Sequence, residues 1–147
     1  MSDRSFSKKC GQCGERAVAL ARLDAYETTV EHDGRTYAVR IPDFVVPQCA
    51  NCGTVVLDHD ANDRIDTAFR EAAGLLTPEE IRSNRTSLGL TQQALADALR
   101  VSVSTLSRWE TGGQIQQRSL DLLMRLYFEL PEVRSAACQE SRGRLPV

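Results

Sequence analysis

The chain has 147 residues, of which 41% are hydrophobic, and a formal net charge of −2. This length suits one domain or two small ones, and the hydrophobic content is sufficient for a folded core. No apolar run approaches the length of a membrane span, and the first nine residues lack the apolar segment of a signal peptide. We therefore expect a cytoplasmic protein with no membrane partner, in which clustered cysteines favour a metal over disulfides.

The charge is spread almost evenly along the chain. Residues 1–76 carry 9 basic and 12 acidic side chains, a balance of −3, and residues 77–147 carry 9 basic and 8 acidic side chains, a balance of +1. Neither part is a polycation, so sequence-independent affinity for nucleic acid is expected to be modest. Binding to DNA would then need well-placed hydrogen-bond donors and two copies of the domain.

The first chemical motif consists of two matched cysteine pairs. Cys10 and Cys13 are separated by two residues, as are Cys49 and Cys52, and a glycine follows each pair. This spacing lets two thiolates reach one ion while backbone amides point at the sulfurs, and the glycine permits the tight reversal. Four thiolates complete a tetrahedral site with no open position, so we expect one structural Zn²⁺ per chain. Four unrelated cysteines and a redox-active dithiol are the alternatives.

The residues between the cysteine pairs predict a β-hairpin. Residues 17–31 and 35–46 are rich in strand-compatible side chains, and Asp33-Gly34 between them is a hairpin turn signal. The hairpin would return Cys49 towards Cys10 and form a zinc-ribbon-like module, whose own core is too small to fold well without metal. Residues 55–57 resemble a last strand that leaves the metal site.

An amphipathic helix is predicted over residues 60–73, with Gly74 ending it. The connection that follows is short, so we expect limited motion between the two halves of the chain. His59 is expected to be a surface residue rather than a metal ligand. Cys138 has no partner and is expected to be an inert thiol in the C-terminal helix.

A second domain is predicted to begin at Thr77. Threonine at the cap position, Pro78 at the first helical position and Glu80 at the third satisfy three separate preferences for a helix start. The helix is predicted to run to Leu88 and to close at Gly89.

Two short helices joined by a tight turn follow, and their pattern is what reading of the DNA major groove requires. Thr91 is a good N-cap for the first helix, and Ser102 can cap the second. In the second helix Val103, Leu106 and Trp109 recur every three residues, which predicts that all three are buried. The polar side chains expected to face outward are Ser104, Thr105, Ser107 and Arg108. The alternative is an ordinary helical hairpin with a solvated polar face.

Two more helices are predicted at residues 117–130 and 132–139, and Ile115 is expected to plug the core before them. The first of these helices is apolar on several sides, which indicates burial against its own domain and against another surface. We weigh a homodimer interface slightly above the alternative, which is packing under the last helix. Residues 141–147 resemble a disordered tail.

Together these patterns predict an α+β fold. A zinc-binding β-hairpin module with a following helix occupies residues 1–76, and an all-α, five-helix helix-turn-helix domain occupies residues 77–140. No constellation of nucleophile and general base accompanies the thiols, so we do not expect an enzyme.

The two central helices resemble the Cro/C1 (Xre) helix-turn-helix family. The resemblance is carried by TQQALA at residues 91–96 and SVSTLSRWETG at residues 102–112. It implies a compact five-helix domain whose third helix enters the major groove, with Trp109 in the core and Glu110 as a structural charge. By position, Gln92 would anchor the DNA backbone. The candidate contacts to bases or phosphates are Ser102, Ser104, Thr105 and Arg108.

The four-cysteine module followed by this helix-turn-helix is similar to the MqsA/YgiT-type antitoxin family over about residues 9–130. The resemblance implies that the four cysteines are zinc ligands and that Arg108 reads a base. It also implies an N-terminal module that binds a small ribonuclease toxin, and a C-terminal domain that dimerises and represses its operon through a palindrome. Ser104 stands where the family has a base-reading asparagine, so the operator sequence does not carry over.

The functions that remain open differ in what the zinc module does. The leading hypothesis is a zinc-containing transcriptional repressor that acts as an antitoxin. The closest rival is a stand-alone Xre-type regulator whose zinc module binds another protein. A redox protein is the third hypothesis, and it would be metal-free and reversibly oxidised.

Overall fold

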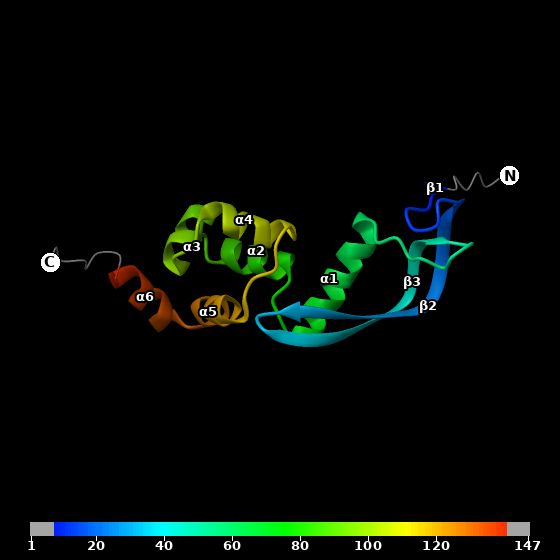
Figure 1. Cartoon of the computed structure of the whole chain (residues 1–147). Coiled ribbons are helices and arrows are strands. Elements are labelled where there is room, and N and C mark those ends of the chain that lie inside the picture. Colours follow the sequence, from blue (N-terminus) through cyan, green and yellow to red (C-terminus); the bar gives the residue numbers. More distant parts are fainter. Residues whose placement is uncertain (1–7, 141–147) are drawn as a thin grey trace. The chain divides into compact units, whose positions relative to one another are not determined.

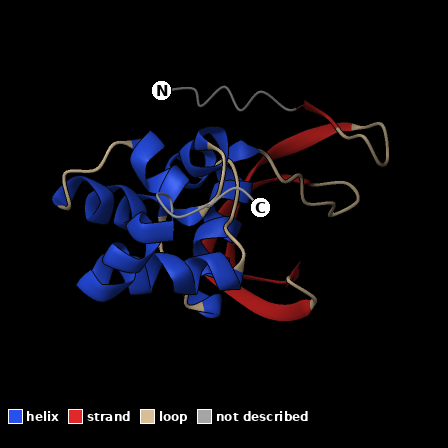
Figure 2. Ribbon diagram, turned by 90° about the vertical axis from the view of Figure 1, so that its left-hand side faces the viewer, coloured by secondary structure: helices blue, strands red, loops and turns tan. Residues whose placement is uncertain are grey.

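The computed structural model describes residues 8–140 and divides into two compact units, Met1–Ala73 and Gly74–Val147. All of its described strands lie in the first unit and five of its six helices in the second, which gives the expected α+β class with a zinc-ribbon-like module (Figures 1 and 2). The units meet at Gly74, whereas the sequence analysis places the division after residue 76. The predicted tail, residues 141–147, lies outside the described residues.

The first unit is built on a long antiparallel hairpin. Strand β1 (Lys8–Lys9) pairs with β2 (Arg16–His32), which pairs with β3 (Arg35–Cys49), so the sheet order is β1-β2-β3. Asp33 and Gly34 form the two-residue turn with φ of +50° and +70°. Positive φ at both positions matches the twist of the flanking strands, which is why Asp-Gly is favoured there. The predicted hairpin is therefore confirmed.

The hairpin bends at Asp43, which adopts a left-handed φ of +53°. The buried side chains of β3 change from Val39 and Ile41 to Phe44 and Val46, so the inward-facing positions shift by one residue across the bend. Arg64 donates to the carbonyl of Asp43 at 3.0 Å and lies over the Phe44 ring at 5.1 Å. The shift by one residue thus lets side chains on both sides of the bend contribute to the buried core.

Helix α1 (His59–Ala73) covers β3 and completes that core. Phe69 is fully buried and meets the rings of His32 and Tyr37 edge-on, each at 5.2 Å between centroids. The predicted helix is confirmed. The predicted strand at residues 55–57 is wrong, because the structure has only an isolated bridge between Gln48 and Val55.

Within residues 74–140, the second unit contains five helices, as expected. They are α2 (Pro78–Ser87), α3 (Gln92–Leu99), α4 (Val103–Thr111), α5 (Arg118–Glu129) and α6 (Pro131–Glu140). Thr77 and Glu80 form the predicted capping box, with Thr77 N donating to Glu80 Oε2 at 2.8 Å. The core of this unit gathers side chains from every helix: Leu76, Ile81, Leu95, Ala96, Leu99, Leu106, Trp109, Met124 and Tyr127, with Val133 and Ala137 packed against it.

A buried polar network fixes the start of the second unit to α5. The Asp121 carboxylate accepts hydrogen bonds from Leu76 N at 2.8 Å, from Gln116 at 3.0 Å and from Arg125 at 2.8 Å. Gln116 Nε2 also donates to Leu76 O, and Arg125 donates to Gly74 O. Gln116, rather than the predicted Ile115, is the buried residue after α4, because its amide finds partners inside the protein.

No described helix combines the length and the apolar character that crossing a lipid bilayer requires.

Candidate metal centre and nucleic-acid interface

The four cysteines of the first unit come together in two matching turns. Gly14 N donates to Cys10 O at 3.0 Å, and Gly53 N donates to Cys49 O at 2.8 Å. Both glycines have left-handed φ, +79° and +76°, which residues with a Cβ rarely adopt. The repeated Cys-x-x-Cys-Gly pattern is therefore a repeated backbone turn that presents two sulfurs on one side.

The long hairpin brings these two turns together. Val18 pairs with Cys49 across the sheet, and Ala50 N donates to Ala17 O at 2.8 Å. As a result Cys10 Sγ lies 3.7 Å from Cys52 Sγ, although 42 residues separate them in the chain. The expected return of the second pair towards the first is confirmed.

The four sulfurs could hold one metal ion. All of them lie within 4.8 Å of one another, and the Sγ atoms of Cys13 and Cys49 are 3.6 Å apart. A zinc ion bound tetrahedrally at about 2.3 Å from each sulfur would space the sulfurs about 3.8 Å apart. The donor set and its spacing therefore fit zinc.

The thiols differ in how readily they deprotonate. Hydrogen bonds from the side chain and backbone of Thr54 lower the pKa of Cys52 to about 6. At Cys13, the pKa is lowered chiefly by a hydrogen bond from the Asn51 side chain. At Cys49 a backbone hydrogen bond from Cys52 lowers the pKa, but burial and the neighbouring thiols outweigh it and raise the pKa to about 11. Thiolates are the form that binds metal, so the contacts of Cys52 and Cys13 favour the ligand state of those two residues.

The other metal-binding residue types named by the sequence analysis stand apart from this cluster. His59 is exposed at the start of α1, where it lies 3.5 Å from Asp63. Cys138 is an exposed free thiol in α6. Neither belongs to the four-cysteine group.

Helices α3 and α4 of the second unit are connected by a tight turn that contains no glycine. Arg100 caps α3 in a left-handed conformation with φ of +61°, and Val101 N donates to Ala96 O at 3.0 Å. Thr91 and Ser102 cap α3 and α4 by accepting hydrogen bonds from Ala94 N and Thr105 N. Both predicted caps are confirmed, and they set where each helix begins.

Helix α4 has a buried side and an exposed side. Leu106, Trp109 and Glu110 are buried, whereas Ser104 and Arg108 are exposed. Val103 is 38% exposed, so its predicted burial is wrong. It occupies the first position of the helix, where its side chain extends past the packed core.

The five predicted DNA contacts lie on α3, α4 and the residue that caps α4, and they differ in how free their polar atoms are. The Ser102 hydroxyl lies 2.8 Å from the Thr105 hydroxyl and 3.1 Å from the Ser104 hydroxyl, so these three share a hydrogen-bond cluster at the start of α4. Gln92, partly buried at the start of α3, donates through Nε2 to Glu110 at 2.8 Å. Their contact with DNA stays a prediction.

Arg108 differs from the other arginines of the second unit. Among residues 8–140, its guanidinium has no hydrogen-bond or ion-pair partner. The arginines that are engaged with other groups of the protein are Arg82, Arg85, Arg100, Arg118, Arg125 and Arg134. This unit contains no lysine. Among its described residues, Arg108 is therefore the cationic side chain that makes no hydrogen bond or ion pair within the protein.

A buried ion pair supports the same surface from behind. Arg85 donates to both Glu110 carboxylate oxygens, at 2.6 and 3.0 Å, and also to Leu90 O at 2.8 Å. Burial alone would raise the pKa of Glu110, but the hydrogen bonds from Arg85 and Gln92 outweigh it, and the pKa is lowered. Glu110 therefore stays charged, ties α2 to α4, and holds the amide of Gln92.

This three-residue network was not predicted from the sequence. Arg85 and Glu110 are 25 residues apart, and neither belongs to a local pattern that points to the other. The only available signal is an acidic residue within the apolar repeat of α4, which indicates a buried charge that needs a partner.

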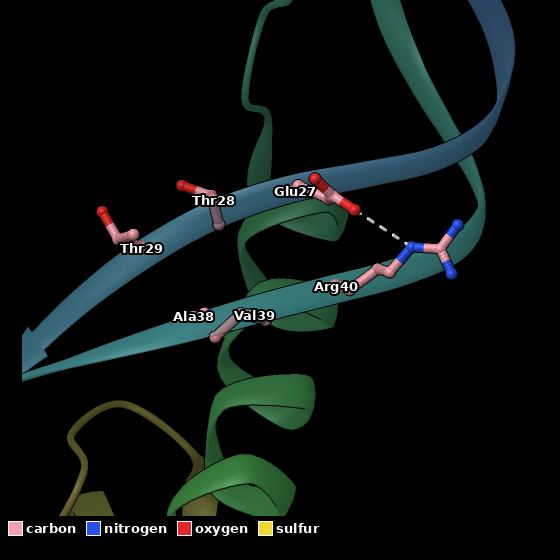
Figure 3. Close-up of a pocket in the computed structure, with 6 residues that line it drawn as sticks. All are labelled: Glu27, Thr28, Thr29, Ala38, Val39 and Arg40. Carbon is pink, nitrogen blue, oxygen red and sulfur yellow. Dashed lines mark hydrogen bonds and ion pairs between the residues drawn. The ribbon is translucent and has the colours of Figure 1, made fainter.

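The hairpin also carries a surface hollow of about 560 Å³ between β2 and β3 (Figure 3). Its lining includes two threonines, Ala38, Val39 and an ion pair in which Arg40 donates to Glu27 at 3.2 Å. Leu20, Val45, Val56 and Leu57, elsewhere in this unit, are exposed apolar side chains.

Comparison with known proteins finds a match within the second unit. Residues 81–132, from α2 to the first residues of α6, match the helix-turn-helix family HTH_3, which implies that this unit binds DNA. No curated protein matches the chain.

Among solved structures, the chain is similar to NE0471 of Nitrosomonas europaea ATCC 19718, described as a "Putative DNA Binding Protein". The two are 17% identical, and the alignment covers 70% of this chain and 86% of NE0471 with a TM-score of 0.38. A TM-score of this size does not establish a shared fold.

Proposed function

We propose that this protein is a zinc-containing transcriptional repressor that binds a palindromic operator as a homodimer and acts as the antitoxin of a toxin-antitoxin pair. The observation that best supports sequence-specific DNA binding is the guanidinium of Arg108, which has no partner within the described residues and lies on the exposed side of α4, within the matched helix-turn-helix. A free arginine can donate two parallel hydrogen bonds to O6 and N7 of guanine in the major groove.

The neighbouring groups support the same surface. Ser104 and Thr105 offer hydroxyls beside Arg108, and Ser102 lies at the start of the helix. Gln92 keeps one amide hydrogen for a phosphate while the other is held by Glu110. Residues 77–147 carry a balance of only +1, so the sequence-independent part of the affinity for DNA should be modest.

The Arg108→Ala variant is expected to lose about 1–3 kcal/mol of binding free energy and to relax specificity at one base position, because the bidentate contact to guanine is removed. Measured affinities for operators changed one base at a time check this. Equal weakening on every sequence would instead make Arg108 a phosphate contact.

The dimer is assigned to α5. Leu122 is 57% exposed, and Leu126 and Leu130 repeat at intervals of four residues along the same side. The alternative of packing under α6 accounts for other apolar residues of this region, such as Phe128, Val133 and Ala137, which pack on the core. Three leucines in an exposed stripe are suited to a second copy of the helix.

Leu126→Lys is expected to convert the dimer into a monomer of 16.3 kDa, because it places a charge in the centre of that stripe. Light scattering coupled to gel filtration measures the mass. Val45→Lys, at an exposed apolar residue of the other unit, is the matched control and should leave the dimer intact. An unchanged mass for Leu126→Lys would exclude this face.

The first unit is assigned to zinc and to the toxin. Zinc would be held by Cys10, Cys13, Cys49 and Cys52, and with four thiolate ligands it would supply structure rather than catalysis. The exposed apolar side chains Leu20 and Val45, on the hairpin, suit a protein partner. The stand-alone regulator remains the rival, since its zinc module would also use such a surface.

A pull-down of the tagged protein from its own host, with zinc assayed in the same sample, separates these two functions. A stoichiometric small protein whose ribonuclease activity is inhibited by this chain, together with one zinc per chain, is the expected result. Zinc without such a partner would leave the stand-alone regulator. A metal-free, reversibly oxidised dithiol would overturn both.

A further inference from the structure

Val103 is an exposed apolar residue on a surface that is otherwise polar. It is the first residue of α4 and is 38% exposed, whereas Leu106 and Trp109 further along the helix are buried. Among the described residues of α2, α3 and α4, Val103 is the only large hydrophobic side chain that is exposed. The other exposed ones lie in the first unit, on α5 or at the residue that caps α5.

Neither packing nor local structure accounts for a valine at this position. It makes no part of the core, and valine is a poorer helix former than alanine because its branched side chain loses rotamer freedom. A single exposed valine is also too small for a protein interface, in contrast to the three-leucine stripe of α5. The exposed Ser104 follows Val103 in α4, and the half-buried Ser107 lies one turn further along on the same side of the helix.

We infer that Val103 is a specificity-determining residue that contacts the 5-methyl group of a thymine in each half-site of the operator. The methyl group of thymine is the apolar feature that the major groove displays, and it distinguishes thymine from the other bases. The N-terminal residues of a recognition helix are the ones that reach base edges. This inference rests on the proposed DNA-reading role of α4 and adds a base identity to it.

Replacement of thymine by deoxyuridine tests the contact, because it removes the methyl group and leaves all hydrogen-bonding groups in place. An operator is first selected from random duplexes with the full-length, zinc-loaded protein, and each thymine is then replaced in turn. At one position per half-site, uracil is expected to weaken binding about fourfold, the value of one buried methyl group. Fluorescence anisotropy measures the affinities.

The Val103→Ala variant is expected to bind the thymine operator about fourfold more weakly per half-site and to lose the response to uracil at that position. Alanine is the better helix former, so the variant should stay folded. Val45→Ala, an exposed valine of the first unit, is the matched control and should keep the full response to uracil.

Two results would overturn the inference while leaving the proposed function in place. One is a selected operator on which uracil has no effect at any position, and the other is an undiminished uracil effect with Val103→Ala. If no sequence were enriched at all, sequence-specific repression itself would fail, and the inference with it.

Discussion

Replacement of Cys49 by serine is expected to unfold residues 8–73 while DNA binding by the helical unit persists. Cys49 is buried, and its sulfur lies 3.6 Å from that of Cys13. Structural zinc in small modules contributes about 10–16 kcal/mol of apparent binding free energy, which is folding free energy when the site forms only in the folded state. Apart from the cysteine cluster, the first unit has a small core between its sheet and the single helix α1, and a domain of this size is marginally stable without such a contribution.

Three measurements on the same sample check this expectation. Zinc content should fall from one ion per chain to none, amide hydrogen exchange should become fast across β2 and β3, and operator affinity should change little. Cys138→Ser is the matched control, because Cys138 is exposed and stands outside the four-cysteine group. Loss of DNA binding together with zinc would show that the two units fold as one cooperative structure.

The features that the sequence predicts well are those decided by neighbouring residues. The Asp33-Gly34 turn, the Thr77 capping box and the Ser102 cap each depend on residues no more than three positions apart. The metal cluster joins distant residues, yet the sequence predicts it because the same Cys-x-x-Cys spacing occurs twice. One pair would supply only two of the four ligands of a tetrahedral site, so the two pairs are expected to share one ion.

The sequence predicts less well which residues near the ends of helices are buried, because this depends on how far the core of the domain extends along each helix. The three-residue repeat of α4 predicts Val103 to be buried, yet the core reaches only to Leu106, one turn further along. Similarly, hydrophobicity alone favours Ile115 over Gln116. Gln116 is buried because its amide donates to Leu76 O, 40 residues away in the chain, and to Asp121 in the following helix. No local pattern shows these partners.

The bend at Asp43 is a further case. An aspartate between strand residues indicates a turn or a strand end, whereas here it takes a left-handed conformation inside a continuous strand. Arg22, which pairs with its carboxylate, and Arg64, which donates to its carbonyl, stabilise that conformation. Both partners are about 21 residues away in the chain, so no local pattern could show them.

Glu110→Ala is expected to destabilise the helical unit by about 3–5 kcal/mol, because it leaves the Arg85 guanidinium partly buried without its partner. The loss is large beside the typical stability of a small domain. Chemical denaturation followed by the fluorescence of Trp109 isolates this unit, since Trp109 is the only tryptophan of the chain and is buried in α4. Gln93→Ala, which removes an exposed hydrogen bond to Asp97, is the control and should cost far less.

The double variant Arg85→Met, Glu110→Leu removes both charges but keeps side chains of similar size, so it distinguishes the effect of the ion pair from the effect of packing. Breaking a buried pair costs more than replacing both partners by apolar groups of similar size, so this variant should recover most of the lost stability. It should nevertheless bind DNA more weakly, because Gln92 loses the carboxylate that orients its amide. Full recovery of both stability and DNA binding would show that Glu110 has no role in placing Gln92.

Protonation of the Glu110 carboxylate is expected to lower the stability of the helical unit at acid pH. The folded pKa of Glu110 lies below its ordinary value of 4.5, so its stabilising contribution is fully present above pH 4.5 and is lost as the pH falls through the folded value. The stability measured from the Trp109 unfolding transition of the wild type should therefore fall as the pH drops below 4.5, and Glu110→Gln should lack that part of the loss. Equal acid sensitivity in both proteins would assign the effect to other carboxylates of the helical unit.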